Sequence, residues 1–232
     1  RKFLVMKQEI LKFDFNNFTQ KKTFCVSIKN FFAYELVKSW PNWPKNALLI
    51  YGPEKCGKSL ITQIWREKSK AIIADSKFFE NFNEISYKKI NKRKRCWIIE
   101  DIELLIESGI RLEEKILNFI NILSLNNNFF IITCNKPPKQ IKFSIPDLES
   151  RLNALIIAEV KEPDQELLKE IIKKKLKSKQ IYISQKNLNF LITRIDRTYS
   201  SAIRVAEDID RKSLQNHSNI TANFIKKILM NY

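Results

Sequence analysis

One twelve-residue stretch constrains the fold of this chain more than any other. The apolar run Leu48–Tyr51 ends in Gly52. After four intervening residues, Gly57, Lys58 and Ser59 open an amphipathic segment. This order of strand, glycine-bounded loop and helix is the setting of a phosphate-binding P-loop. Gly52 and Gly57 allow the backbone turns that point successive N–H groups at a phosphate, and the following helix adds the partial positive charge of its N-terminus.

The side chains of this loop have distinct expected roles. Lys58 is expected to reach the β- and γ-phosphates, and Ser59 to hold Mg²⁺. The residues expected to bind the ligand are Gly52, Pro53, Glu54, Lys55, Cys56, Gly57, Lys58, Ser59 and Leu60. A strand-to-helix turn that binds no phosphate is the alternative. The chain has three glycines and places two of them here beside a Lys-Ser pair, which favours the P-loop.

The composition is that of a folded globular chain. The 232 residues are 44% hydrophobic and include 16 Phe, enough for the core of one α/β domain with a smaller companion. No apolar run approaches the roughly 20 residues that span a bilayer, and no signal-peptide pattern opens the chain. We therefore expect a soluble, cytoplasmic protein with no membrane partner.

Charge and metal-binding residue types limit the possible functions. The formal net charge is +17, which fits a nucleic-acid or acidic partner. Lys, Ile and Asn are abundant throughout, however, so compositional bias explains the charge at least as well. The four cysteines share no metal-ligand spacing, which predicts reduced thiols. A single histidine, His217, excludes histidine-based triads and most zinc sites.

Short apolar runs alternate with amphipathic stretches over the first two thirds of the chain. Uninterrupted runs of this length are typical of parallel strands covered by helices on both faces. The predicted strands are 48–51, 71–74, 96–101, 129–133 and 154–160, and the predicted helices among them are 24–40, 57–68 and 112–123. The sequence therefore predicts an α/β fold with a five-stranded parallel sheet.

The chain after residues 162–164 is predicted to be helical. Four apolar stripes at helical spacing follow one another there. They are Leu168, Ile171, Ile172 and Leu176; Leu188, Leu191, Ile192 and Ile195; Ala202, Val205, Ala206 and Ile209; and Phe224, Ile225, Ile228 and Leu229 behind the expected N-cap Thr221. We expect three parts: an N-terminal segment at 1–23, an α/β subdomain at 24–161 and a small all-α lid at 162–232.

Polar side chains are expected beside the P-loop at the carboxyl ends of two strands. Glu100 and Asp101 end the third strand, where one carboxylate can hold Mg²⁺ through water and the next can orient an attacking water. This is the position expected of a Walker B motif, whose first acidic residue is normally Asp. Glu100 therefore puts the metal geometry and the rate of hydrolysis in question. Asn135 ends the fourth strand and could contact a γ-phosphate or its attacking water. A solvated acidic turn and a turn-forming Asn are the alternatives.

These motifs, in this order and with a helical lid, resemble the AAA+ ATPases and, in detail, their DnaA-related branch. The resemblance extends over 24–232 and rests on Trp40-Pro41, Trp43-Pro44, Ile99–Leu105, Thr133–Pro138, Leu148–Leu152 and Arg204–Glu207. It implies that Arg151 is an arginine finger, which reaches a nucleotide on a neighbouring subunit. It implies that Arg204 is the sensor 2 arginine and that the ligand is ADP or ATP with Mg²⁺. Surface ion pairs are the alternative for both arginines.

A second resemblance concerns the N-terminal segment. Gln8, Leu11 and Phe13 have the form Gln-x-x-Leu-x-Phe, an amide followed by two apolar anchors, which resembles the bacterial sliding-clamp-binding motif. An N-terminal strand is the alternative. With this motif, and with no helix-turn-helix expected after the lid, the chain is similar to the Hda-like proteins. The family's implied activity is to dock on the DNA polymerase III sliding clamp (β subunit), contact DnaA and promote ATP hydrolysis by DnaA. The chain's own ATPase activity is expected to be weak or absent, and self-association is left open.

Two other functions stay open. A DnaA-like or DnaC-like protein would hold DNA through basic loops, for which Lys88–Arg95 and Lys173–Lys179 are the candidates. The first run has one neighbouring aromatic, Tyr87, for base stacking, so a solvated loop is the simpler interpretation. An autonomous ATPase motor would turn over steadily without DnaA and would depend on Glu100.

Overall fold

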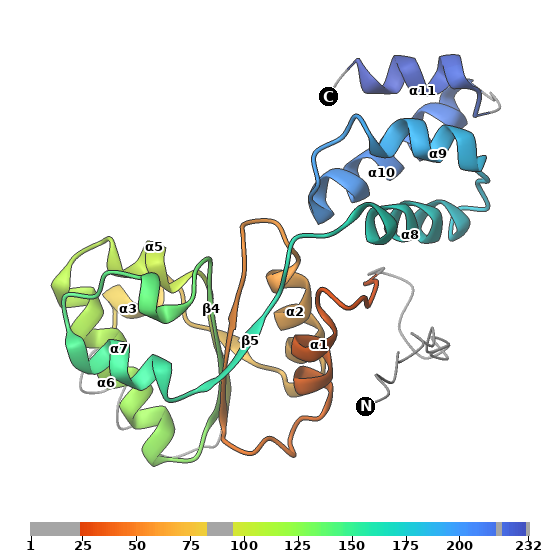
Figure 1. The fold of residues 1–232 in the computed structure, drawn as a ribbon. Coiled ribbons are helices and arrows are strands. Elements are labelled where there is room, and N and C mark those ends of the chain that lie inside the picture. The colour runs from red at the N-terminus through yellow and green to blue at the C-terminus, as the bar shows by residue number, and fades with distance from the viewer. Residues whose placement is uncertain (1–23, 83–94, 217–219, 231–232) are drawn as a thin grey trace, which may run out of the picture.

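The computed structural model describes residues 24–82, 95–216 and 220–230 (Figure 1). The clamp-like motif of Gln8, Leu11 and Phe13 and the basic run up to Lys94 lie outside the described residues. An α/β part comes first, and four helices follow it along the chain. None of the described helices combines the length and apolar character needed to cross a bilayer.

Five parallel strands form the sheet, as predicted. Their bounds are β1 Ala47–Tyr51, β2 Ile72–Ile73, β3 Cys96–Ile99, β4 Phe129–Cys134 and β5 Ile156–Glu159. The strand order is β2-β3-β4-β1-β5, with Leu49 of β1 opposite Ile132 of β4 and Ile157 of β5. Because all strands run the same way, the P-loop, the acidic residues after β3 and the end of β4 meet at one edge of the sheet.

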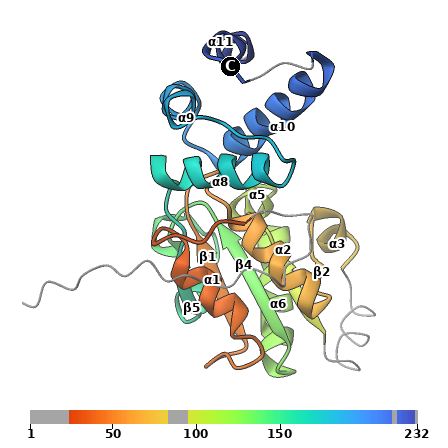
Figure 2. The same ribbon diagram turned by 90° about the vertical axis from the view of Figure 1, so that its right-hand side faces the viewer.

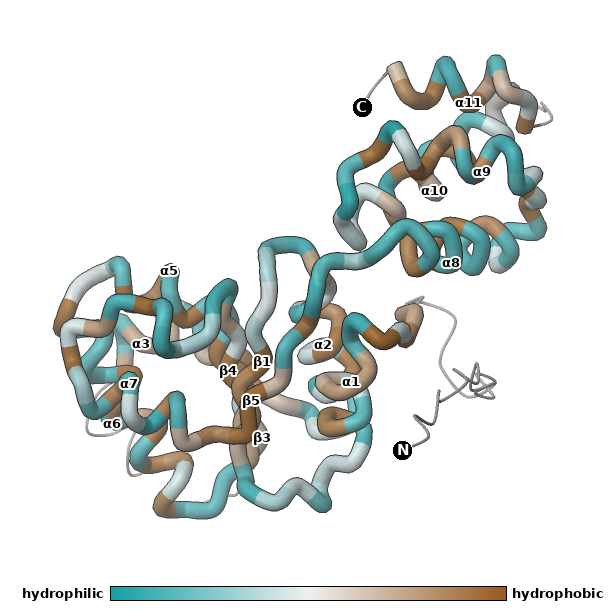
Figure 3. The backbone as a smooth tube through the Cα atoms, viewed as in Figure 1, coloured by the Kyte–Doolittle hydropathy of each residue, from teal (hydrophilic) through white to brown (hydrophobic). Residues whose placement is uncertain are grey.

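Helices cover both faces of this sheet (Figures 1 and 2). α1 Phe31–Lys38 and α2 Lys58–Ser69 lie on one face. The other face carries α3 Ser76–Glu80, α5 Ile102–Ile106, α6 Ile110–Leu125 and α7 Pro146–Asn153. Leu48 and Ile50 belong to the core on the α1–α2 side and Leu49 to the opposite core, because successive strand residues point to opposite faces. Because both faces of the sheet are covered by apolar cores, the strands consist mainly of apolar residues, as their brown colour in Figure 3 shows.

The last four helices pack together as a lid near the carboxyl edge of the sheet (Figure 2). They are α8 Gln165–Lys177, α9 Gln185–Ile192, α10 Tyr199–Asn216 and α11 Ala222–Leu229. The first three predicted stripes are buried, and so are Ile225 and Ile228 of the fourth. Thr221 accepts the Phe224 N–H at 3.3 Å, as an N-cap does. The expected division at 161/162 falls between β5 and α8, and the domain boundaries themselves stay a prediction.

The first helix begins later than predicted. The Asn30 side chain accepts the Ser27 N–H at 2.9 Å and donates to Cys25 O at 3.0 Å. This local turn competes with helix formation over 24–30. Phe31, placed in the apolar stripe by its spacing, is 40% exposed. The helices α3 and α5 and the 3₁₀ turn Pro138–Gln140 were not predicted, because elements of three to five residues show too few turns for a period. The helix α7 was not predicted either.

Candidate functional site

The P-loop connects β1 to α2 and requires its glycines for steric reasons. A Cβ added to Gly52 would lie 1.9 Å from Val160 O, the backbone that follows β5. Gly57 is the N-cap of α2 with φ of +110°, a conformation that residues with a Cβ rarely adopt. The loop therefore passes close to β5 and turns sharply into α2, so that the N-terminus of α2 faces the carboxyl edge of the sheet.

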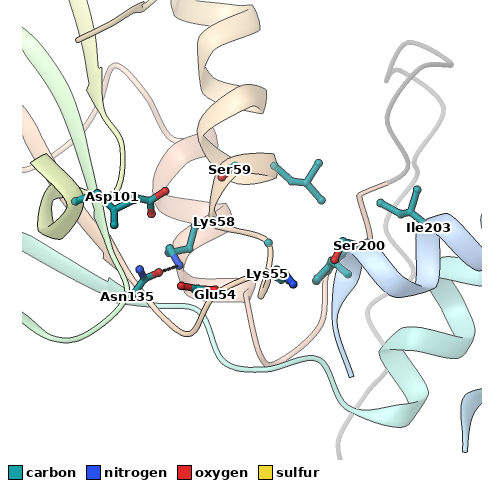
Figure 4. Close-up of a pocket in the computed structure, with 12 residues that line it drawn as sticks. Glu54, Lys55, Lys58, Ser59, Asp101, Asn135, Ser200 and Ile203 are labelled. Atoms are coloured by element: carbon teal, nitrogen blue, oxygen red, sulfur yellow. Dashed lines mark hydrogen bonds between the residues drawn. The ribbon is translucent and has the colours of Figure 1, made fainter. Parts of the chain in front are cut away.

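Lys58 lies at the centre of the site. Its side chain is buried, and Nζ donates to Gly52 O at 2.7 Å, Pro53 O at 3.0 Å and Asn135 Oδ1 at 2.8 Å (Figure 4). All three acceptors of this ammonium are neutral oxygens. A negatively charged phosphate oxygen would form a stronger hydrogen bond with it than any of them. The structure thus brings the predicted P-loop lysine together with the Asn at the end of β4.

The two acidic residues after β3 point to different partners. Glu100 Oε1 accepts a hydrogen bond from Thr62 Oγ1 on α2 at 2.8 Å. Asp101 has the left-handed backbone angles φ +47° and ψ +60°, and its N–H donates to Thr133 Oγ1 at 2.9 Å. The turn at Asp101 directs that carboxylate into the cavity beside the P-loop (Figure 4).

A cavity of about 400 Å³ lies between the P-loop and the lid. Its lining residues are Glu54, Lys55, Gly57, Lys58, Ser59, Leu60, Asp101, Leu104, Asn135, Tyr199, Ser200 and Ile203. This volume is in the range of pockets for nucleotide-sized ligands. Gly52, Pro53 and Cys56 belong to the loop but do not line the cavity. Of the side chains expected to act on phosphate or metal, Lys58, Ser59, Asp101 and Asn135 line this cavity and Glu100 does not. Their roles stay predictions.

The residues present fit a magnesium nucleotide. Mg²⁺ takes oxygen ligands and usually keeps several waters, with one or two carboxylates and substrate phosphates. The hydroxyl of Ser59 and the carboxylate of Asp101 line the cavity beside buried Lys58. No group of three His, Cys, Asp or Glu side chains suited to a metal occurs among the described residues. Any Mg²⁺ here would therefore depend on phosphate oxygens, as expected at a P-loop.

Tyr199, the first residue of α10, joins the lid to the α/β part. Its buried hydroxyl donates to Cys25 O at 2.7 Å and accepts from Asn30 Nδ2 at 2.8 Å. Its ring stacks on Phe24 with 5.9 Å between centroids. Its N–H donates to Lys55 O in the P-loop at 3.2 Å. Burial raises the pKa of the Tyr199 hydroxyl well above its ordinary value, so the group stays a neutral donor.

Replacing Tyr199 with Phe should lower the free energy of unfolding by about 1–2 kcal/mol, because two buried hydrogen bonds are lost while the ring is kept. Urea denaturation of the variant measures this change. Tyr182→Phe is the matched control, since Tyr182 is 82% exposed and should show a change near zero. Equal effects of the two substitutions would mean that the hydroxyl of Tyr199 does not hold the lid.

The thiols near the site are not reactive groups. Burial raises the pKa of the Cys56 thiol in the P-loop and raises that of Cys25 to about 11. Neutral thiols are poor nucleophiles and poor metal ligands. Cys56 is therefore a small buried residue of the loop, and the prediction of free thiols is consistent with all four cysteines.

The two predicted arginines lie outside the cavity. Arg151 is on α7, about half exposed, and its Nε lies 3.4 Å from Asp147 Oδ1 one turn earlier. Arg204 is on α10 and lies in a separate hollow with Glu207, Asp208 and Arg211. The lid residues that line the P-loop cavity are instead Tyr199, Ser200 and Ile203. Arg204 does not line this cavity, and its contact with a bound nucleotide stays a prediction.

Two further residues that shape the site were not predicted from the sequence. Glu103 Oε1 accepts the backbone N–H groups of Asn135 and Lys136 and so fixes the loop after β4. Glu113 on α6 is buried and accepts the N–H groups of Ser144 and Ile145 just before α7. Glu103 lies in a segment on which the DnaA resemblance rests, but its partners are 32 and 33 residues away. Neither contact leaves a local signal in the sequence.

The left-handed backbone at Asp101 should make the stability of the protein sensitive to the residue at this position. No side-chain hydrogen bond caps α5 at Asp101, so a change in stability there reports the left-handed angles. Asp101→Asn should change the free energy of unfolding by less than about 0.5 kcal/mol, because Asn tolerates this region, whereas Asp101→Ala should lower it by about 1 kcal/mol. Urea denaturation checks both values, with exposed Asp147→Ala as the control. An alanine variant as stable as the Asn variant would contradict the assigned backbone conformation.

The chain is similar in sequence and in fold to known proteins. Residues 164–229 match the family model described as Hda, lid domain. A chromosomal replication initiator protein DnaA of Nautilia profundicola is 26% identical over 224 residues, which cover 90% of this chain and 51% of that protein. Domain III of the Thermotoga maritima replication initiation protein DnaA has a TM-score of 0.74 at 20% identity, covering 90% of this chain and 94% of that chain. A replication initiator DnaA bound to AMPPCP and single-stranded DNA has a TM-score of 0.69 at 21% identity, covering 84% and 66%.

The fold is therefore that of the AAA+ P-loop proteins, with a five-stranded parallel sheet and a helical lid. Within this class the chain is similar in sequence to the replication initiator DnaA proteins, and its lid to the Hda lid domain, so the predicted resemblance is confirmed. The chain spans about half the length of the curated DnaA relative it matches.

Proposed function

We propose that this protein is an Hda-like regulator that binds an adenine nucleotide and stimulates ATP hydrolysis by DnaA. The observation that carries the proposal is the position of Arg151. Its guanidinium is exposed on α7, lies outside the chain's own P-loop cavity and is paired only with Asp147 among the ion pairs of the described residues. An exposed pair of this kind is weak and can be exchanged for another partner.

The helix that carries Arg151 is well positioned for this role. The buried carboxylate of Glu113 accepts the N–H groups of Ser144 and Ile145, at 3.1 and 2.7 Å. Leu148 and Leu152 on the inner face of α7 are fully buried. Arg151 is therefore an exposed side chain on a fixed helix, a suitable origin for a guanidinium that must reach a partner's nucleotide.

The charge distribution of phosphoryl transfer explains what such a residue supplies. Negative charge spreads over the γ-phosphate oxygens in the transition state, and an arginine supplied in trans stabilises it by about 10³ to 10⁵ in rate. The chain's own site would hold ADP or ATP with Mg²⁺ through Lys58 and Ser59, with Asp101 and Asn135 beside the phosphates. The AMPPCP bound to a DnaA of similar fold supports this assignment. That nucleotide would act mainly as a conformational ligand.

The tether to DNA is proposed from sequence alone. Gln8, Leu11 and Phe13 would dock in the sliding clamp, with the glutamine amide hydrogen-bonded and the two apolar side chains buried. Tethering raises the effective concentration of the regulator near DnaA without adding a contact to DnaA itself. The proposed site of action is therefore the sliding clamp loaded on DNA.

A single-round hydrolysis assay tests this proposal. DnaA loaded with ATP is mixed with clamp-loaded DNA, with and without this protein, and the loss of ATP is followed. Faster hydrolysis is the expected result. An unchanged rate with clamp and DNA present would overturn the regulatory function.

DNA binding through basic side chains is the second candidate. The net charge of +17 and the single-stranded DNA bound to a DnaA of similar fold favour it. The lid lysines argue against a concentrated basic surface, because several of them pair with carboxylates: Lys169 with Glu166, Lys173 with Glu170, Lys175 with Glu207 and Lys179 with Asp210. Tight binding to clamp-free DNA that falls steeply with salt would favour this candidate. Steady ATP turnover without DnaA, abolished by substituting Glu100, would instead indicate an autonomous motor.

A further inference from the structure

A buried threonine connects the P-loop helix to the acidic end of β3. Thr62 lies three residues after Ser59 on α2, and 1% of it is exposed. Its Oγ1 lies 2.8 Å from Glu100 Oε1 and 3.2 Å from Ser59 O. A hydroxyl has one hydrogen to donate, and the charged carboxylate is the stronger acceptor. The nearer contact, to Glu100, is therefore the principal one.

This contact explains how a glutamate can stand where the family pattern has an aspartate. Glu has one more rotatable bond than Asp, so its carboxylate has more positions to choose among. A buried hydroxyl that binds one carboxylate oxygen selects one of them. Residues three apart on a helix are neighbours on its surface, so a carboxylate held at Thr62 also lies beside the turn that carries Ser59.

We propose that Thr62 is a positioning residue that holds the Glu100 carboxylate on the Ser59 side of the site, where its second oxygen can bind a magnesium-bound water. The inference rests on the proposed nucleotide function and deepens it. Thr62 and Glu100 act as a unit: the hydroxyl compensates for the additional methylene of the glutamate. Neighbouring Asp101 has a different support, its own backbone turn and Thr133, and is not part of this unit.

The test measures magnesium dependence of nucleotide binding and needs no hydrolysis. Binding of ADP is titrated in EDTA and at increasing Mg²⁺ for the wild type, Thr62→Val, Thr62→Ser, Glu100→Asp and the Thr62→Val, Glu100→Asp double variant. Affinity in EDTA should be similar in all five proteins. Thr62→Val should need about tenfold more Mg²⁺ for the same gain in affinity, as for other groups that orient a metal ligand. Thr62→Ser, which keeps the hydroxyl, should restore the wild-type requirement.

The double variant separates positioning from packing. If the hydroxyl acts through Glu100, Thr62→Val should have little further effect once Glu100→Asp has made that side chain too short for Thr62 to hold, and the two changes should be non-additive. Additive effects, or a Thr62→Val variant with an unchanged Mg²⁺ requirement, would overturn the inference. A lower Mg²⁺ requirement in Thr62→Val would overturn it too, because the hydrogen bond would then hold Glu100 away from the metal. A wild type that binds no ADP even with Mg²⁺ would overturn the nucleotide site itself, a result distinct from the others.

Discussion

Replacing Arg151 with alanine should return DnaA-bound ATP hydrolysis to its unstimulated rate. Arginine fingers contribute about 10³ to 10⁵ in rate when they are supplied in trans, so loss of the guanidinium should remove essentially all stimulation. The variant should fold normally, because Arg151 is exposed and its pairing with Asp147 contributes at most about 0.5 kcal/mol. The single-round assay described above measures the effect, and ADP binding by the variant should be unchanged.

Three further variants make this result specific. Arg151→Lys should fail as well, because a lysine lacks the planar, forked donors of the guanidinium. Arg194→Ala is the matched control: Arg194 is an exposed arginine stacked on Phe190 in the lid, and its loss should leave stimulation intact. Alanine at Gln8, Leu11 and Phe13 should weaken stimulation at low protein concentration and allow recovery at high concentration, since it removes a tether rather than a catalytic group. Full stimulation by Arg151→Ala would contradict the trans-finger role.

Replacing Lys58 with methionine should weaken ADP binding by about 100-fold, because truncating a buried, hydrogen-bonded charge usually costs about 2–5 kcal/mol. Methionine keeps most of the aliphatic volume while removing the ammonium that contacts Gly52 O, Pro53 O and Asn135 Oδ1. Isothermal titration of ADP with Mg²⁺ measures the loss. Circular dichroism establishes that the fold is retained.

Lys55→Met is the matched control for this change. Lys55 belongs to the same loop and lines the same cavity, but its side chain is exposed and its known contact there is through the backbone carbonyl, which accepts from Tyr199 N. Its substitution should reduce ADP affinity less than about threefold, the effect expected of an exposed charge in high dielectric. Similar losses from both substitutions would show that net charge, and not the buried position of Lys58, holds the phosphates.

Much of the fold could be predicted because its signals are local. Strands buried on both faces read as apolar runs, and the long helices show their buried stripes over several turns. The α6 stripe is entirely buried, as predicted: Leu112, Ile116, Phe119, Ile120 and Leu123. The first helix was predicted too long because its apolar residues continue into the turn made by Asn30, a side chain that bonds to the backbone in place of the helix.

The site divides in the same way. The P-loop could be recognised from local sequence, since strand, glycines, lysine and helix are contiguous. The acidic residues and Asn135 could be predicted because parallel strands end at a common edge. Three other features are visible only in the folded chain. Thr62 bonds to Glu100, Tyr199 bonds to Cys25 and Asn30 across 174 and 169 residues, and Arg204 lies apart from the cavity. These features were not predictable because they depend on how helices and strands that have already formed pack against one another. Docking is set by the shape of the buried faces and leaves no pattern at the individual residues that come to touch.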